Sequence, residues 1–501
     1  MIYRQKNPFP HTGDTLIFFT NEKTYKKDPR IRQLDVLVKG KIAKKIKEHR
    51  FTGKKDESVV LEGGDIYEHI IIYGIGESLR NSIAGANIIA RSLKSSSIHI
   101  FYSPLMGKDF FEGGKQAALG FELSNYSFDQ YKSKEDLKKK HAVKDMYLYS
   151  EGELPRTFDE GIEWGKTLSE GIFLTRNMVN EPASHMHPET MVAQAFAIEK
   201  KSKGTVSVQV LGKDECQKIG MGSYLGVAQG SDREPKFIIL KYDGGMSKIE
   251  SGSLKAENRK RRKICLVGKS ITFDSGGLSL KPSKSMETMK MDMAGGATVL
   301  GVFNILARTD KVVHEVWGVL PACENMVSGR SLRPGDIVTA LNGKTIEVLN
   351  TDAEGRLALA DAVAYAEKYI KPDSIIDLAT LTGACMVALG EDIAGIFGND
   401  SNSIKKFIEK AKEEGEEICE LPLYKPYLTL LKSEIADIKN IGGTGYGGAI
   451  SGALFIGEFI KKTKWIHLDI AGPAYNSGAI KGTIGKGGTG WGILTIMSLL
   501  V

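Results

Sequence analysis

A short buried strand that is followed at once by charged residues is the feature that most constrains the fold of this chain. Residues 264–267 form an apolar run that ends at Gly268, and this predicts a buried strand. Lys269 follows directly, and Asp274 comes five residues later. Charged residues placed after a buried strand are typical of α/β proteins, in which ligands bind outside the carboxyl ends of the strands. We therefore expect an α/β fold with a functional site at the strand ends.

An acidic cluster lies further along the chain, in the segment NTDAEGR at residues 350–356. A helix would place Asp352 and Glu354 on different faces, whereas a tight loop can direct both carboxylates at one point. Two hard oxygen ligands that converge suit a divalent cation. The guanidinium of Arg356 beside them could hold an anion. The alternative is a solvated acidic turn whose carboxylates face the dipole of the next helix.

Two more charged residues follow the predicted strand. Lys281 precedes Pro282 in a loop, and Asp292 lies among methionines just before a pair of glycines. Taken singly, each candidate has an ordinary alternative: the lysines could lie on the surface, and the aspartates could cap a turn or begin a helix. Their combination with the acidic segment favours a site.

The pattern of strands and helices divides the chain near residue 150. Residues 70–73 and 98–102 predict strands on either side of a helix over 80–94, which is a βαβ pattern with a parallel sheet. Residues 151–178 have a helical period. The second half alternates again, with strands expected at 236–242, 263–267, 312–320 and 374–379, a hairpin at 337–348 around Asn342-Gly343, and a helix over 357–370.

Composition agrees with a soluble protein of two or three domains. The chain has 501 residues, of which 42% are hydrophobic and 26% are charged. No apolar run is long enough to cross a membrane, and the first residues lack the apolar core of a signal peptide. The five cysteines are scattered, which predicts free thiols in a reducing compartment and hence a cytoplasmic protein.

Part of the net charge of +7 lies in two basic runs, residues 132–141 and 255–263. Such runs are usually solvated faces or exposed loops. Binding to nucleic acid or to an acidic partner is the alternative.

Two stretches of the sequence, VGKSITFDSGGLSLKPSKSMETMKMDMAGGA and NTDAEGRLALADA, closely resemble the leucyl (cytosol) aminopeptidases, a family of binuclear metallo-aminopeptidases. The resemblance extends from about residue 170 to the end and includes ENMVSGRSLRPGD, DLATLTGA and LDIAGPAY. It departs at Ser270, where the family usually has a glycine. A serine there should be tolerated if its backbone angles are ordinary.

The resemblance implies a two-domain architecture. Each domain would be a mostly parallel or mixed sheet flanked by helices. The expected parts are an N-terminal α/β domain at 1–150, a linker helix at 151–178 and a catalytic domain at 179–501. The catalytic domain would hold a binuclear metal site at its strand ends.

The resemblance also implies the chemistry of the site. Two divalent ions, Mn²⁺ or Zn²⁺, would be bridged by Asp274 and Glu354. Asp352 would bind one ion, and Asp292 and the neutral amine of Lys269 would bind the other. A lysine binds a metal only when it is deprotonated, so the metal must depress its pKa.

By the same resemblance, Lys281 would stabilise the oxyanion of the reaction. Arg356 would hold a bicarbonate that relays a proton. An apolar pocket would favour leucine or methionine side chains. The candidate substrate-binding residues are Met291, Met293, Asn350, Ala353, Thr380, Leu381, Gly383 and Ala474.

We expect from this an enzyme that releases N-terminal residues from short peptides and works as a cytoplasmic homohexamer without a membrane. DNA binding, which some bacterial family members show, is not favoured but stays open. A phosphatase is the other alternative, since acidic two-metal sites also serve phosphate esters. The glycine-rich stretches lack the pattern of a phosphate-binding loop.

Overall fold

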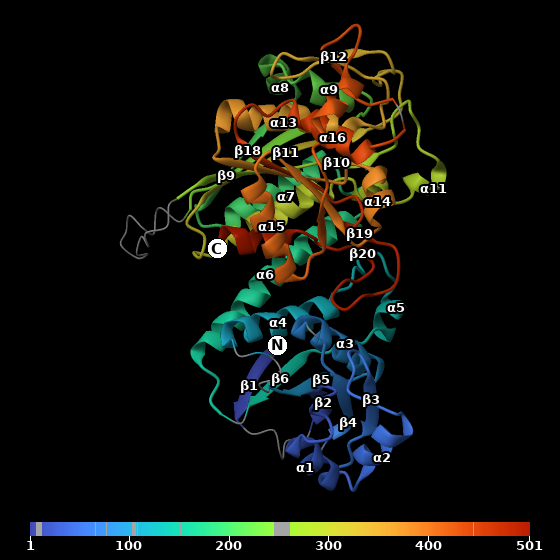
Figure 1. Cartoon of the computed structure of the whole chain (residues 1–501), viewed down its shortest axis with the longest axis vertical. Coiled ribbons are helices and arrows are strands. Elements are labelled where there is room, and N and C mark those ends of the chain that lie inside the picture. The colour runs from blue at the N-terminus through green and yellow to red at the C-terminus, as the bar shows by residue number, and fades with distance from the viewer. Residues whose placement is uncertain are drawn as a thin grey trace. The chain divides into compact units, whose positions relative to one another are not determined.

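The computed structural model describes residues 1–6, 13–65, 67–76, 78–102, 107, 109–150, 152–244, 261–443 and 445–501 (Figure 1). The chain forms two compact units, one of residues 1–169 with 478–485 and one of residues 170–477 with 486–501. Helix α6 (Arg156–Asn180) covers most of the predicted helical segment. The domain boundaries expected from the sequence stay predictions. Among the described residues, no helix is both long and apolar enough to span a membrane.

The first unit is built on a six-stranded mixed sheet in the order β1-β6-β5-β2-β4-β3. Only β3 and β4 pair antiparallel among its described strands. The strands are β1 (Ile2–Lys6), β2 (Gly13–Thr20), β3 (Ser58–Glu62), β4 (Tyr67–Gly74), β5 (Ser97–Phe101) and β6 (Asp145–Ser150). The helices are α1 (Pro29–Leu37), α2 (Lys41–Glu48), α3 (Leu79–Ser92), α4 (Phe110–Asn125) and α5 (Lys134–Lys139).

Strand β2 shows why helices cover both faces of this sheet. Leu16 and Phe18 pack in a core that includes residues of α1 and α2. Ile17 and Phe19 pack in a second core that includes residues of α3 and α4. Successive side chains of a strand point to opposite faces, so a strand that is apolar at every position must be buried on both.

The second unit is built on a nine-stranded mixed sheet in the order β16-β15-β18-β14-β9-β11-β8-β7, with β10 paired to β11. Its middle strands, β18, β14, β9 and β11, are parallel. The strands are β7 (Val206–Leu211), β8 (Lys236–Tyr242), β9 (Lys263–Gly268), β10 (Ser270–Asp274), β11 (Glu315–Asn325), β14 (Ser374–Ala379), β15 (Ala394–Gly398), β16 (Ile418–Glu420) and β18 (Lys464–Asp469).

Helices and two small sheets complete this unit. The helices are α7 (Pro188–Lys201), α8 (Lys213–Ile219), α9 (Gly222–Ala228), α11 (Ser283–Met286), η2 (Met289–Met291), α12 (Ala294–Leu306), α13 (Glu354–Tyr365), η3 (Ala366–Ile370), α14 (Gly383–Leu389), α15 (Ser401–Glu414), η4 (Lys425–Leu431), α16 (Gly448–Gly457) and α17 (Ile493–Leu500). The small sheets are β12 (Ile337–Thr339) with β13 (Thr345–Glu347) and β17 (Ile438–Lys439), and β19 (Tyr475–Asn476) with β20 (Gly487–Gly488).

Helix α13 is anchored in the core of this unit by a buried carboxyl group. Asp361, which is fully buried, accepts hydrogen bonds from the backbone N–H of Tyr224 at 2.8 Å and of Leu341 at 2.7 Å. Burial raises the pKa of Asp361 to about 7. The side chain thereby joins α13 to α9 and to the loop after β12. This fixes the helix whose first residue is Glu354.

Most of the elements expected from the sequence are present, with shifts at their ends. The strands at 236–242 and 374–379 and the Asn342-Gly343 hairpin are confirmed. Strand β11 begins at Glu315 and not at residue 312. Helix α13 begins at Glu354, three residues before the predicted start, so Glu354 belongs to a helix and only Asp352 lies in a turn before it.

Candidate metal centre

Strands β9 and β10 follow one another along β11, and Lys269 lies between them. Lys263–Val267 pair with Glu315–Val319, and Ser270–Asp274 pair with Ala322–Asn325. The backbone N–H of Lys269 donates to the carbonyl of Leu378 in β14 at 2.9 Å. This short break places Lys269 directly after β9, as the sequence predicts, and Asp274 at the end of β10, a strand that the sequence analysis did not predict.

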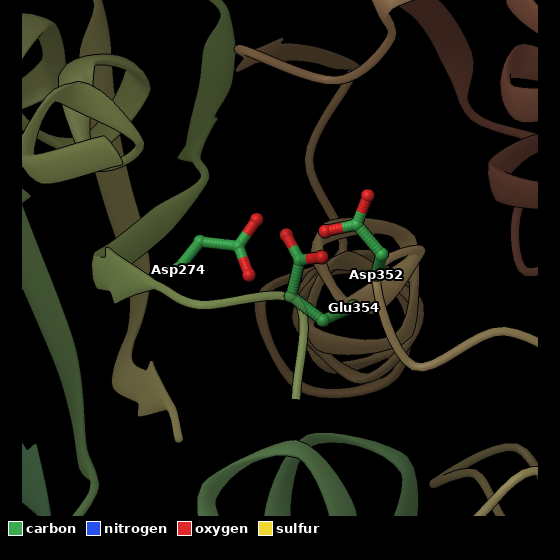
Figure 2. Close-up of side chains that lie close together, drawn as sticks. All are labelled: Asp274, Asp352 and Glu354. Carbon is green, nitrogen blue, oxygen red and sulfur yellow. The ribbon is translucent and has the colours of Figure 1, made fainter. Parts of the chain in front are cut away.

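Three carboxylates converge beside this break. Asp274 comes from the end of β10, Asp352 from the turn before α13, and Glu354 from the first position of α13 (Figure 2). Each offers an oxygen that lies within 4.8 Å of those of the other two. Asp274 and Glu354 are buried, while Asp352 is partly exposed. Figure 2 shows the three side chains gathered in one place, with their carboxylates close together.

Lys269 connects this cluster to a fourth carboxylate. Its Nζ lies 2.8 Å from Asp292 Oδ1 and 2.8 Å from Glu354 Oε1, and it donates to the carbonyl of Thr380 at 2.9 Å. The hydroxyl of Thr380 donates to Asp292 Oδ1 at 2.7 Å. Burial alone would lower the pKa of Lys269, but the carboxylates of Asp292 and Glu354 outweigh it and raise that pKa.

Lys281 lies at the opposite side of the cluster and is more accessible. Its Nζ is 2.9 Å from Asp274 Oδ2 and 2.5 Å from Asp352 Oδ1. Its side chain is 14% exposed, against 3% for Lys269. One lysine is therefore enclosed by the site, whereas the other borders it.

The carboxylates of the site exceed what the two lysines can neutralise. Asp292 Oδ2 and Glu354 Oε2 are buried and have no hydrogen-bond partner among the described residues. Burial, with Glu354 nearby, raises the pKa of Asp274, and burial raises the pKa of Asp292 although Lys269 opposes this. Buried anionic oxygens without partners are costly unless a cation binds them. The donor set of carboxylates and one amine therefore fits divalent cations.

Two asparagines that the sequence analysis did not single out hold the acidic segments in place. Asn325, the last residue of β11, donates to Asp274 Oδ1 at 2.9 Å and to the carbonyl of Thr351 at 3.0 Å. Asn440, which is fully buried, donates to the carbonyl of Asn350 at 2.7 Å. The rule that identified Lys269 could have identified Asn325, because Asn325 lies at the carboxyl end of a largely buried strand.

Arg356 also contacts Asn440, the asparagine that holds Asn350. Its Nη1 donates to the carbonyl of Asn440 at 2.8 Å, while its Nε is buried without a partner among the described residues. Burial lowers the pKa of Arg356. A buried guanidinium with an unused donor is suited to an anion.

Two glycines allow the close approach of these groups. A Cβ on Gly355 would lie 2.4 Å from Lys269 Cε, so only a glycine lets Lys269 pass the start of α13. Gly276 has a φ of +87°, and a Cβ there would lie 2.9 Å from Asp352 Oδ1. Ser270, by contrast, lies in extended strand β10 and donates its hydroxyl to the carbonyl of Gly268 at 2.8 Å.

The candidate substrate residues fall into two groups. Thr380 contacts Asp292 and Lys269, and Asn350 Oδ1 accepts from the backbone N–H of Asp352 at 2.8 Å. The others lie in or next to elements of the second unit: Leu381 after β14, Gly383 at the start of α14, Met291 at the end of η2, Ala353 before α13, Met293 before α12 and Ala474 after β18. Met293 is completely buried and Ala474 is 4% exposed.

The fold and the site define a two-domain α/β metal-dependent hydrolase. The models of the cytosol aminopeptidase family match twice, with the N-terminal domain at residues 16–135 and the catalytic domain at residues 173–497. The chain therefore belongs to the cytosol aminopeptidase family, and it is a peptidase that removes residues from chain ends.

Relatives and solved structures agree with this assignment. The chain is 37% identical to a probable cytosol aminopeptidase of Alkaliphilus oremlandii, covering 97% of this chain and 96% of the relative. It is 39% identical to one of Microcystis aeruginosa, with the same coverage. A tomato leucine aminopeptidase variant matches with a TM-score of 0.88 and 33% identity over 100% of this chain and 96% of that one. A bottromycin maturation enzyme in complex with Mn matches with a TM-score of 0.82 and 26% identity over 98% and 99%.

Proposed function

We propose that this enzyme is a leucyl aminopeptidase that releases leucine, methionine and other apolar residues from the N-terminus of short peptides. The observation that carries the proposal is the convergence of Asp274, Asp352 and Glu354 around buried oxygens without partners. The Mn in one structural relative supports manganese as an occupant, with zinc as the other candidate. Two such cations would activate a water and polarise the scissile carbonyl.

The proposed ligand roles are those that the family resemblance implies. Asp274 and Glu354, which are buried, would bridge the two cations, and Asp352, which is partly exposed, would hold one of them. Asp292 and Lys269 lie together on the enclosed side at 2.8 Å. Lys269 would bind after losing its proton to solvent, since a cation between the same carboxylates replaces the charge of the ammonium group.

Lys281 and Arg356 are the proposed catalytic residues. Lys281 is partly exposed and reaches the open side of the cluster, so it can donate a hydrogen bond to the negative oxygen that develops on the substrate carbonyl. Arg356 has a buried, unused Nε, which supports the binding of a bicarbonate that moves the proton from water to the leaving amine. The apolar side chains of Met291 and Leu381 are candidates for the substrate pocket.

Metal removal tests the proposal. Exhaustive chelation should abolish the release of leucine from leucine anilide, and Mn²⁺ or Zn²⁺ should restore it. N-acetyl-leucine anilide should be refused, because the blocked amine no longer binds a cation. Full activity in a protein that elemental analysis shows to be free of metal would contradict the proposal, as would hydrolysis of phenyl phosphate in place of the anilide.

We also propose that the enzyme works in the cytoplasm, as the names of its relatives suggest, and as a homohexamer. The basic run at 132–141 gives little support to a role in DNA binding. Within it, Lys132, Lys139 and Lys140 pair with the nearby carboxylates Asp129 and Asp136. In the other run, residues 255–260 lie outside the described residues, and Arg261 and Lys263 face Glu315.

A further inference from the structure

A cavity of about 530 Å³ lies in the first unit, between α1, α2 and the segments that flank them. Small-molecule sites typically measure ~300–1,000 Å³, so this cavity has the size of one. Its lining is formed by Tyr25, Lys26, Ile31, Arg32, Asp35, Ile42, Ala43, Ile46, Lys47, Arg50, Phe51 and Thr52. All of these belong to the first unit, and the metal centre belongs to the second.

One wall of the cavity is apolar and includes two aromatic rings. Ile42 and Ile46 lie one turn apart on α2 and therefore share a face. Ile42 and Phe51 are buried in the core beneath, while Tyr25 and Ile46 are only partly covered. The rings of Tyr25 and Phe51 meet edge to face with centroids 5.9 Å apart. The partly covered side chains offer an apolar surface to a ligand.

The rim of the cavity carries four cations: Lys26, Arg32, Lys47 and Arg50. All four are exposed, and none forms an ion pair with a described residue. On the same helix, Lys44 and Lys45 do face a carboxylate, that of Glu48, at 3.9 and 3.7 Å. The four cations of the lining therefore have no described carboxylate to offset their charge by direct ion pairing.

The single acidic residue of the lining, Asp35, offsets only one of the four positive charges of this rim. Asp35 Oδ1 accepts hydrogen bonds from the backbone N–H of Ile42 at 2.8 Å and of Ala43 at 3.0 Å. Its negative charge therefore stabilises the N-terminus of α2. The cavity combines an apolar wall with an excess of positive charge.

We propose that this cavity binds an aromatic phosphate ester. The aromatic body would lie against Tyr25 and Ile46, and the phosphate would meet Arg32, Lys47 and Arg50. A phosphate ester carries up to two negative charges and three acceptor oxygens, which matches several cations better than a single carboxylate does. Arginine is the side chain best shaped for this contact, because its planar group can donate two hydrogen bonds at once.

The test uses the full-length chain and the fluorescent probe 1-naphthyl phosphate in low-salt buffer, with binding followed by fluorescence anisotropy. The variant Lys47→Ala/Arg50→Ala removes two charges from the rim. The variant Lys41→Ala/Lys44→Ala removes two charges from the same helix outside the cavity. Thermal unfolding of both variants confirms that they fold. Inorganic phosphate and 1-naphthol serve as competitors that carry only one half of the ligand.

We expect one probe to bind per subunit, about tenfold more weakly in Lys47→Ala/Arg50→Ala and unchanged in Lys41→Ala/Lys44→Ala. Each half-ligand should compete at least about tenfold more weakly than unlabelled aromatic phosphate does. Equal weakening in both variants would mean general attraction to a basic surface and would overturn the proposal. Unchanged binding in Lys47→Ala/Arg50→Ala would show that the probe binds elsewhere, for example at the metal centre, and would overturn the proposal. If inorganic phosphate competed as well as the aromatic phosphate, the apolar wall would have no role in binding, and the proposal would also fail.

Discussion

Lys269 and Lys281 have the same ammonium group, and their surroundings separate their roles. Lys269 is 3% exposed and is held by Asp292, Glu354 and the carbonyl of Thr380. Lys281 is 14% exposed and touches Asp274 and Asp352 from the open side. An amine that is enclosed by carboxylates can bind a metal ion, whereas an amine at the edge of the site can contact the substrate. The exposure of the two side chains therefore supports the ligand role for the first and the catalytic role for the second.

Replacing Lys281 by alanine should reduce kcat by ~10²–10³ while both metals stay bound. The loss arises because the substituted enzyme has one donor fewer for the transition state. Steady-state kinetics with leucine anilide, combined with elemental analysis, measures both quantities.

Arg356→Ala should reduce kcat less than Lys281→Ala does, because water can replace a proton relay. If Lys281→Ala loses its metals instead, that lysine is a ligand or a support, and our assignment is wrong.

Gly355→Ala should damage the metal centre although alanine favours helix. Alanine is preferred over glycine inside a helix by about 1 kcal/mol, so the change should stabilise the start of α13 on its own. The new Cβ would nevertheless lie 2.4 Å from Lys269 Cε and 2.6 Å from its Nζ. We expect metal affinity to fall about 10–100-fold, the range seen when the support of a ligand is disturbed.

The matched control is Gly329→Ala, since a Cβ on Gly329 meets open space. Titration of the metal-free proteins with Mn²⁺ compares the two variants with the parent. Equal metal affinity in Gly355→Ala and the parent would show that Lys269 does not need its observed position.

At the scale of elements, strands β14 and β18 are joined by a buried charged pair. Asp377 lies opposite His467 in the register, and its Oδ1 is 2.6 Å from His467 Nδ1. The indole N–H of Trp465 donates to Asp377 Oδ2 at 2.6 Å. Burial opposes the charge on the imidazole, but Asp377 outweighs burial and raises the pKa of His467 above its ordinary value of 6.5. Below this raised pKa, protonation of the imidazole therefore stabilises the folded sheet.

This pair predicts a pH dependence of stability with a definite sign. A folded-state pKa above the unfolded value gives stabilisation that is fully present below pH 6.5 and is lost as the pH rises through the folded pKa. The free energy of unfolding of the parent relative to His467→Asn should therefore decline from pH 6.5 upward. Urea unfolding over a pH series measures it, with the exposed His49→Asn as control. A difference that stays constant with pH, or grows, would contradict the charged pair.

The sequence predicted the strand-end residues well because they obey a rule about sheets. Lys269 follows an apolar run that was predicted to be a buried strand, and it lies directly after β9 as the rule places it, whereas strand β10, which ends at Asp274, was not predicted. The start of α13 was predicted too late because no side chain marks it. Ala353 stands at the cap position, where a serine, threonine or aspartate would have signalled the end of the loop.

The supports of the site were harder to predict than its charged residues. Asn440 holds Asn350 from a position 90 residues away in the chain, beside a glycine-rich stretch whose role the sequence left open. The parallel pairing of β13 with β17 helps to bring the two segments together. Local sequence patterns contain no information about such a distant contact, which depends on the order of the strands.

For the whole molecule, three large apolar side chains of the second unit are strongly exposed. Val387 is 91% exposed, Tyr446 is 86% exposed and Ile435 is 64% exposed. Association into a closed symmetric assembly is the common way to cover them.

We expect a hexamer of roughly 330 kDa, six times the chain mass of 54.8 kDa. Static light scattering at micromolar concentration measures the mass directly. If the active sites face an enclosed interior, access depends on substrate size, so dipeptides and tripeptides with an N-terminal leucine should be cleaved while a folded protein with the same N-terminus is spared. The matched comparison is that folded protein after denaturation and digestion into short peptides. A stable monomer with full activity would contradict the assembly, and with it the physical reason for expecting short peptides rather than whole proteins as substrates.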